Sequence, residues 1–208
     1  MCFVYPEGRS SQSNPFEADA VTALAWLLHG RLADQLANEC DPSTGATKVA
    51  PVRRACSPAE FWERGIGVVT PLRAQEGLII GRLREVFHGT PPHLIRGAVD
   101  TVERFQGQER DVIIASFALG DPDAIFREDE FLLSLNRFNV LASRARAKLV
   151  VFVSQEVVDH LSGNIETLRE SRLLKLYAQS FCSSARSLTL GHVVNGCPKP
   201  VPGVFRYH

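Results

Sequence analysis

Short apolar runs rich in β-branched residues alternate along this chain with stretches of helical spacing. The clearest runs are "GIGVVT" at 65–70, "DVIIASFAL" at 111–119 and "KLVVFVS" at 148–154. Strands of a parallel sheet are covered by helices on both faces, so they read as continuous apolar runs. The alternation therefore predicts an α/β fold, with a mostly parallel sheet and helices on both of its faces.

Composition and charge set further limits. The chain holds 23 Lys plus Arg and 23 Asp plus Glu, so its net charge of +0 supports a nucleic-acid partner only through local patches. The five cysteines form no CxxC pair and no His/Cys spacing suits zinc, so we predict no metal site. No apolar run reaches the ~20 residues of a membrane span, and the N-terminus carries no signal-peptide pattern. We therefore expect a cytoplasmic protein with no membrane partner.

Capping residues and spacing place the helices. Asn14 followed by Pro15 is a helix start, and helical spacing continues over 15–39. The residues predicted on the buried face of this helix are Ala20, Leu24, Leu27 and Leu28. Segment 94–102 is predicted as a strand and segment 120–130 as a polar loop.

The periodic pattern fades near the C-terminus. From about Ser183 the chain carries Pro and Gly punctuation without helix or strand spacing. We predict one domain over residues 1–181, followed by an irregular, flexible C-terminal tail over 182–208.

A polar segment interrupts two apolar runs in "TVERFQGQERDVII" at 101–114. In a parallel sheet, irregular polar segments at the carboxyl ends of strands bind ligands, and we expect this one there. Gly107 permits close approach to the backbone, while Gln106 and Glu109 supply an amide and a carboxylate. Read alone, the segment fits a polar β-turn with a solvated Glu better than a ligand site.

Basic residues cluster in "NRFNVLASRARAKLVVF" at 136–152. On a helix, Arg137 and Arg144 share a face, and such an arginine needs either a carboxylate or an anionic ligand. For Arg146 and Lys148 a basic solvent-exposed face is the simpler interpretation. Small residues flank Arg144, which favours close approach to a ligand.

The usual phosphate-binding signature is missing from this sequence. No GxxxxGK[ST] pattern occurs, and no apolar strand ends in a paired Asp-Glu that would hold magnesium. "GVVTPLRAQ" at 67–75 does lead a strand into a helix N-terminus, which offers free N–H groups to a phosphate. This turn is common in α/β proteins and carries little weight alone.

Taken in order, these stretches resemble the C-terminal motor lobe of superfamily-one helicases, in the group with replication, nuclease-linked and RNA-decay helicases. "GVVTPLRAQ" is similar to the lobe's strand-Thr-Pro-x-x-x-Gln segment, "TVERFQGQERDVIIAS" to motif V and "RFNVLASRAR" to motif VI. "SNPFEADAV" is similar to the N-x-x-E-A that opens the lobe's first helix. The resemblance covers about residues 3–180. It implies a RecA-like, P-loop-NTPase-type lobe without its own Walker A.

The resemblance also implies roles for individual residues. Those placed at the nucleotide are Gln106, Gly107, Glu109 and Arg144. Arg144 is the implied catalytic residue, because the motif VI arginine reaches across the cleft between lobes to the γ-phosphate. Those placed at the nucleic-acid backbone are Thr70, Pro71, Thr101 and Val102. The implied supporting residues are Gln75, Arg137 and Asn139.

The implied cofactor is ATP with Mg²⁺, bound jointly with a first lobe that this sequence lacks. The implied partners are single-stranded nucleic acid, with DNA favoured over RNA, an N-terminal RecA-like lobe and, as a further candidate, a nuclease domain. The chain is therefore expected to serve an ATP-hydrolysing helicase and to be inactive alone. Two alternatives stay open, a non-catalytic docking module derived from a helicase lobe and a free-standing doubly wound domain that binds a nucleotide differently.

The sequence departs from the family pattern in places. Glu103 stands where the family often has Asp, and "NVLAS" replaces "NVALT" in motif VI. The Q-Y-R-x-H-P segment that normally precedes this lobe is missing from the sequence. The chain therefore reads as a fragment of a larger motor.

Overall fold

The computed structural model describes residues 1–34, 39–40, 47–48, 54–105 and 107–208. The described strands are β1 (Cys2–Tyr5), β2 (Ala33–Asp34), β3 (Glu39–Cys40), β4 (Thr47–Lys48), β5 (Arg54–Ala55), β6 (Ile66–Thr70), β7 (Val99–Thr101), β8 (Arg110–Ser116), β9 (Ala145–Ser154), β10 (Ser184–Val194) and β11 (Cys197–Tyr207). The described helices are α1 (Pro15–Leu28), α2 (Pro58–Glu60), α3 (Arg73–Val86), α4 (Pro92–Ala98), α5 (Pro122–Leu132), α6 (Leu135–Ser143), α7 (Gln155–Asp159), α8 (Ile165–Glu170) and α9 (Arg172–Leu176). The π-helical turns are η1 (Phe61–Gly65) and η2 (Tyr177–Phe181).

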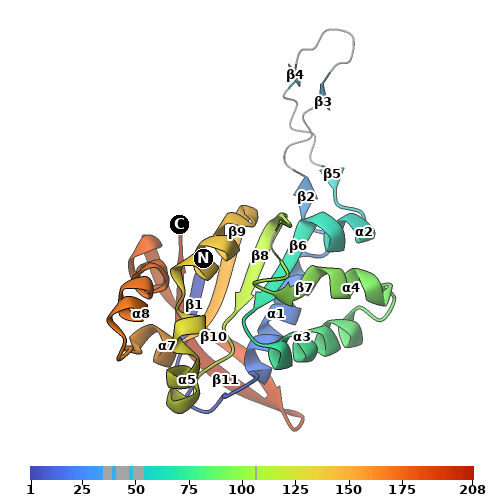
Figure 1. The fold of residues 1–208 in the computed structure, drawn as a ribbon. Coiled ribbons are helices and arrows are strands. Elements are labelled where there is room, and N and C mark those ends of the chain that lie inside the picture. The colour runs from blue at the N-terminus through green and yellow to red at the C-terminus, as the bar shows by residue number, and fades with distance from the viewer. Residues whose placement is uncertain (35–38, 41–46, 49–53, 106) are drawn as a thin grey trace.

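One 7-stranded sheet organises the molecule, with the strand order β10-β11-β1-β9-β8-β6-β7 (Figure 1). Strands β1, β9, β8, β6 and β7 pair in parallel, and the β10–β11 hairpin joins β1 antiparallel. Two small antiparallel pairs, β2 with β5 and β3 with β4, lie outside this sheet. The predicted α/β fold with a mostly parallel sheet and helices on both faces is confirmed.

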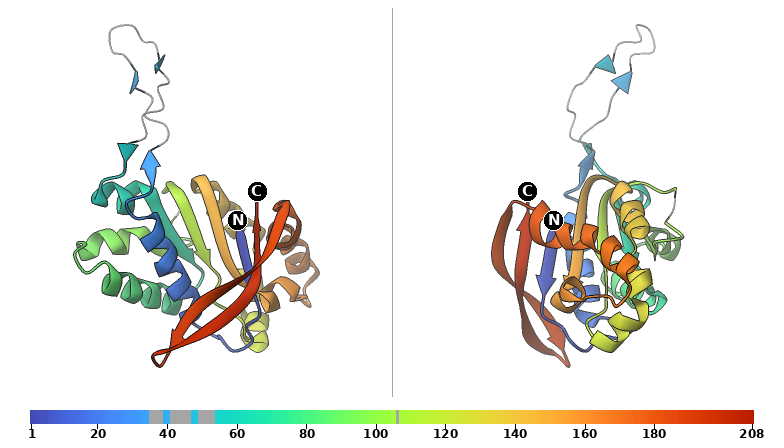
Figure 2. Two further views of the ribbon diagram at one scale, coloured as in Figure 1. Left: turned by 180° about the vertical axis from the view of Figure 1, so that it is seen from behind. Right: turned by 60° about the vertical axis from the view of Figure 1, so that its left-hand side comes forward.

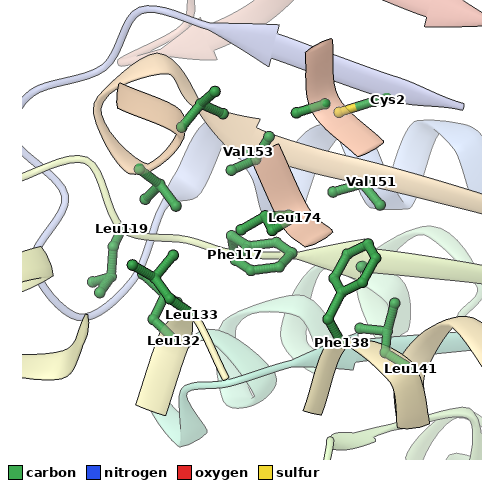
Figure 3. Packing of buried hydrophobic residues seen from close by; sticks show 14 of the residues in the cluster. Cys2, Phe117, Leu119, Leu132, Leu133, Phe138, Leu141, Val151, Val153 and Leu174 are labelled. Carbon is green, nitrogen blue, oxygen red and sulfur yellow. The ribbon is translucent and has the colours of Figure 1, made fainter. Parts of the chain in front are cut away.

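Alternate residues of the central strands supply two hydrophobic cores, one on each face. Ile113 and Val151 belong to the cluster under α5, α6, α7 and α9, whereas Ile114 and Phe152 belong to the cluster under α1, α3 and α4. Figure 3 shows the first of these cores, in which Phe138 and other side chains gather around the strands. Burial on both faces explains the continuous apolar runs of the sequence.

Helix α1 begins as predicted but ends early and buries a different face. Asn14 caps it, because its side chain accepts a hydrogen bond from the Glu17 N–H. The helix ends at Leu28, and Gly30 follows with φ +74°, a conformation that stops a helix. Its buried residues are Phe16, Glu17, Ala18, Val21, Thr22 and Ala25. The predicted face is offset from the buried one: Ala20, Leu24 and Leu28 pack half-buried against the core, and Leu27 stays 45% exposed.

Residues 184–207 form a β-hairpin, so the prediction of an irregular tail is wrong. β10 and β11 pair from Ser184↔Tyr207 to Val194↔Cys197, and β11 continues the sheet at β1 (Figure 2). The side chains of the hairpin that pack on the core below α1 are Leu188, Leu190, Val201 and Phe205. Gly203 is required in β11, because a Cβ there would lie 2.5 Å from the Phe3 ring. The division of the chain at residue 181 stays a prediction.

Two further segments differ from expectation. Residues 92–98 form α4, so only the end of the predicted strand 94–102 is extended, as β7. Most of the predicted loop 120–130 is helical, as part of α5, which Asp121 caps by accepting a hydrogen bond from the Ala124 N–H. Among the described residues, no helix has the length and apolar character needed to cross a membrane.

Candidate functional site

The residues singled out from the sequence lie at two opposite edges of the sheet. Thr70 and Thr101 end β6 and β7 and pair directly in register at the carboxyl edge. Gly107 and Glu109 come just before β8, at the amino edge, where Arg110 pairs with Ala145. The expected carboxyl-end position is therefore wrong for Gly107 and Glu109. The cause is topological, because a crossover between parallel strands must return to the amino edge and the polar segment is itself that crossover.

The carboxyl edge is closely packed around its predicted residues. Thr70 is fully buried, and its Oγ1 accepts a hydrogen bond of 3.4 Å from the Leu72 N–H. Pro71 and Val102 line a hollow together with Phe117, Phe131 and Arg137. Two predicted backbone-contact residues and one predicted supporting residue therefore share one surface.

Arg137 joins helix α6 to the crossover. Its Nε donates a hydrogen bond of 2.8 Å to Glu103 Oε1, and its guanidinium lies 3.7 Å from the centre of the Phe131 ring. Glu103 is the position at which the family pattern often has Asp. Asn139, on the same helix, is exposed.

The amino edge holds Arg144 and the end of the crossover. Arg144 caps α6, and its carbonyl accepts a hydrogen bond of 3.0 Å from the Arg110 N–H. Its half-buried side chain donates to Val140 O at 3.3 Å, and no ion pair to it occurs within the described part of the chain. Gly107 is exposed with φ +83°, and Glu109 is exposed beside it. Gln106 lies outside the described residues.

Arg110 is a structural residue that the sequence did not reveal. It is buried, and its guanidinium donates to Gln108 Oε1 at 2.8 Å and to Glu109 O at 3.0 Å. It also lies over the Phe105 ring at 5.2 Å. Burial lowers the pKa of Arg110. The residue therefore holds the crossover in shape.

A buried carboxylate, Glu17, anchors the carboxyl edge. It accepts hydrogen bonds from Tyr5 Oη at 2.6 Å, from Ser116 Oγ at 2.5 Å and from the Ala118 N–H at 2.9 Å. Ala118 adopts φ +64°, which turns its N–H toward this carboxylate. Burial raises the pKa of Glu17 to about 7. The N-x-x-E-A resemblance marked the residue, but not these partners.

Gln75 extends the same network into α3. Its Oε1 accepts a hydrogen bond of 2.7 Å from the Asn14 N–H, and its Nε2 donates to Ser116 Oγ at 2.9 Å. Gln75 is fully buried. It therefore ties the start of α1 to β8 and α3, close to Thr70 and Pro71.

The donor set at the amino edge suits the phosphates of a nucleotide. The Arg144 guanidinium, which has no carboxylate partner among the described residues, and the exposed backbone of the positive-φ Gly107 lie at the same edge, and both favour an anion. Within the described ranges, no group of three or more His, Cys, Asp or Glu side chains could hold a metal ion. The edge therefore fits one side of a nucleotide.

Several known proteins resemble part of this chain. A family model described as "AAA domain" matches residues 6–156. The chain is 35% identical over 91 residues to the probable RNA helicase armi of Drosophila melanogaster, which is 42% of this chain and 7% of that protein. It is 33% identical over 119 residues to the DNA polymerase alpha-associated DNA helicase A of Saccharomyces cerevisiae, which is 56% of this chain and 15% of that protein. It is 30% identical over 123 residues to the DNA replication ATP-dependent helicase/nuclease dna2 of Schizosaccharomyces pombe, which is 57% of this chain and 8% of that protein. The chain thus spans a small part of the length of these relatives.

Proposed function

The chain belongs to the AAA domain family whose model covers residues 6–156, and from this premise we propose that it is the second RecA-like motor lobe of a superfamily-one helicase. In such a motor, ATP closes the cleft between two lobes and hydrolysis reopens it. The helicase names of the three relatives support the proposal. The chain would then supply half of a site that a first lobe completes.

The observation that carries this proposal is the state of Arg144. Its guanidinium finds no acidic partner in the described part of the chain, although the side chain is half-buried. A half-buried arginine without a carboxylate favours an anion, here the γ-phosphate. Gly107 and Glu109 would face the nucleotide from the same edge, as would Gln106. Stabilising the charge of phosphoryl transfer in this way contributes about 10³-fold or more in related NTPases.

The carboxyl edge is the proposed contact with single-stranded nucleic acid. Thr70 and Thr101 are paired neighbours there, with Pro71 and Val102 beside them. Arg137 links this edge to α6, whose C-cap is Arg144. A movement of Arg144 at the nucleotide could therefore be transmitted through α6 and Arg137 to the bound nucleic-acid strand. We favour DNA over RNA, and contacts of this kind depend on salt and tolerate many sequences.

ATP with Mg²⁺ is the proposed cofactor, shared with a first lobe that carries the phosphate loop. The metal neutralises developing charge on the phosphates and belongs to that other lobe. This chain contributes Arg144 and the crossover backbone. We propose that it hydrolyses ATP negligibly alone, that it acts in the cytoplasm, and that a nuclease domain is a further candidate partner.

The test mixes the chain with a purified first lobe that carries GxxxxGK[ST], with and without single-stranded DNA or RNA, and measures ATP turnover. Strand-stimulated turnover that needs both lobes supports the half-motor. Robust ATP hydrolysis by the chain alone would contradict the proposal. Association of the lobes without any turnover would favour the non-catalytic docking module.

A further inference from the structure

Strand β10 ends the sheet and leaves one edge unpaired among the described residues. It pairs with β11 alone, over residues 184–194. An open strand edge presents N–H and C=O groups on which another strand can form a ladder. The β10 sequence SARSLTLGHVV contains no proline, so nothing in it removes a donor from that edge.

The prolines of β11 show which groups of β10 point outward. Their pairs across the hairpin are Thr189↔Pro202, Gly191↔Pro200 and Val193↔Pro198. Proline has no N–H, so these are the pairs whose backbone groups turn away from each other. The N–H groups of Thr189, Gly191 and Val193 therefore point to the open edge. The same prolines remove donors from the outer edge of β11, so the hairpin has one blocked edge and one open edge.

A trough runs beside the end of this open edge. Gly191 and Val193 form one wall, and α1 and α3 supply the opposite wall with Trp26 and Val86. Trp26 is 60% exposed and Val86 is 44% exposed, although both are large and apolar. An added strand would cover them with every second side chain, because side chains alternate between faces.

The charges of the trough are already paired within the protein. Asp19 Oδ1 lies 3.1 Å from Arg82 Nε, and Asp19 Oδ2 lies 2.9 Å from His192 Nδ1. Arg82 also lies 3.3 Å from Glu85. The trough therefore offers no free charge to a charged ligand, and an uncharged segment complements it best.

We propose that β10 accepts an extended, uncharged segment of a partner polypeptide as an additional strand. Its main chain would bond the outward groups of Thr189, Gly191 and Val193, while apolar side chains at alternate positions would rest on Trp26 and Val86. A second copy of this chain fits less well, because α1 and α3 lie alongside the edge and the copy would bring its own to the same place. This surface is separate from both edges assigned to the motor.

The test titrates the uncharged peptide acetyl-STVTVTVTS-amide into the protein and follows tryptophan fluorescence. The chain has 2 tryptophans, and Trp62 is fully buried, so a change in emission reports on Trp26. We expect a blue shift that saturates and that disappears in Trp26→Phe. The peptide acetyl-STTTVVVTS-amide, with the same composition but without the alternation, should bind at least ~10-fold more weakly, a difference in apparent Kd.

The decisive variant is Thr189→Pro, compared with Thr189→Ala. Proline removes the outward N–H without touching the bonds to β11, whereas alanine keeps it. We expect Thr189→Pro to weaken peptide binding at least ~10-fold and Thr189→Ala to change it less than ~2-fold. Gly191→Pro repeats the test at the next outward N–H if the first variant does not fold.

Three results would overturn the proposal. The first is equal binding by Thr189→Pro and the parent protein. The second is no saturable signal up to about 1 mM peptide, the weakest affinity that counts as docking here. The third is a dimer in sedimentation velocity that Thr189→Pro abolishes, which would assign the edge to a second copy.

Discussion

The two edges of the parallel sheet hold polar side chains in opposite states. At the carboxyl edge Glu17 and Gln75 are fully buried, and side chains and backbone of the same chain occupy their polar atoms. At the amino edge Arg144 is half-buried and Glu109 is exposed, and no ion pair to either is found in the described part of the chain. Buried polar groups with internal partners contribute to stability and position, whereas a charge without a partner is available to a ligand. Substitutions at the two edges should therefore act on different properties.

The largest expected effect is on turnover at the amino edge. Arg144→Ala should lower the turnover of the two-lobe mixture by about 10³-fold, because it removes charge stabilisation of phosphoryl transfer. The urea midpoint of the variant should stay close to that of the parent chain. Arg146→Ala is the matched control, since Arg146 lies 3.5 Å from Asp111 and is exposed. If Arg144→Ala and Arg146→Ala lowered turnover equally, Arg144 would have no specific role in ATP hydrolysis.

The carboxyl edge should show the reverse behaviour. Glu17→Ala leaves Tyr5 and Ser116 without their acceptor inside the protein, and an unsatisfied buried group costs about 1–3 kcal/mol. We expect a loss of about 3 kcal/mol in the free energy of unfolding, measured by urea denaturation at pH 7. A variant as stable as the parent would show that the network is not part of the framework.

The pH dependence of stability should identify Glu17 directly. Burial raises its pKa from 4.5 to about 7, and at about 1.4 kcal/mol per pKa unit this corresponds to about 3 kcal/mol. The folded state binds the extra proton, so this contribution is complete below about pH 4.5 and is lost as the pH rises through about 7. Urea denaturation from pH 5 to pH 8 should show the decline, and Glu17→Gln should reduce it. The same decline in Glu17→Gln would assign it to another group.

The smallest effect belongs to the ion pair that links the two edges. Arg137 and Glu103 are 35% and 47% exposed, and exposed pairs contribute about 0–1 kcal/mol. A double-mutant cycle with Arg137→Ala and Glu103→Ala should give a coupling below about 1 kcal/mol in unfolding. The strand stimulation of ATP turnover should fall clearly in Arg137→Ala. Unchanged stimulation would remove the proposed link between strand and nucleotide.

Some features of the fold and site followed from local patterns. The apolar runs that became β6, β8 and β9 are buried on both faces. That burial requires apolar residues at successive positions, so the runs are visible in the sequence. The cap at Asn14 involves neighbouring residues only, so it was visible as well. The motif residues could be placed in order because their spacing is local.

Other features depend on contacts between distant segments. Glu17 accepts a hydrogen bond from Ser116, which lies far away in the sequence, and the residue pattern of α1 does not predict that bond. The buried face of α1 was misjudged because it includes the polar Glu17 and Thr22, whereas Leu24 and Leu28 pack only half-buried beside it. Prolines at alternate positions hid β11, since proline usually argues against a strand and here its missing N–H faces outward. The position of Gly107 followed from topology, which spacing does not encode.

Strand β1 also governs how the molecule can assemble over time. It pairs with β9 on one side and with β11 on the other, and both partners come far later in the chain. Closing such long loops costs entropy before any contact forms, so pairings of this kind slow folding. Until β9 and β11 have arrived, β1 presents two free edges and the apolar residues Phe3 and Val4. The period before that closure is the one in which this chain is most exposed to misassembly.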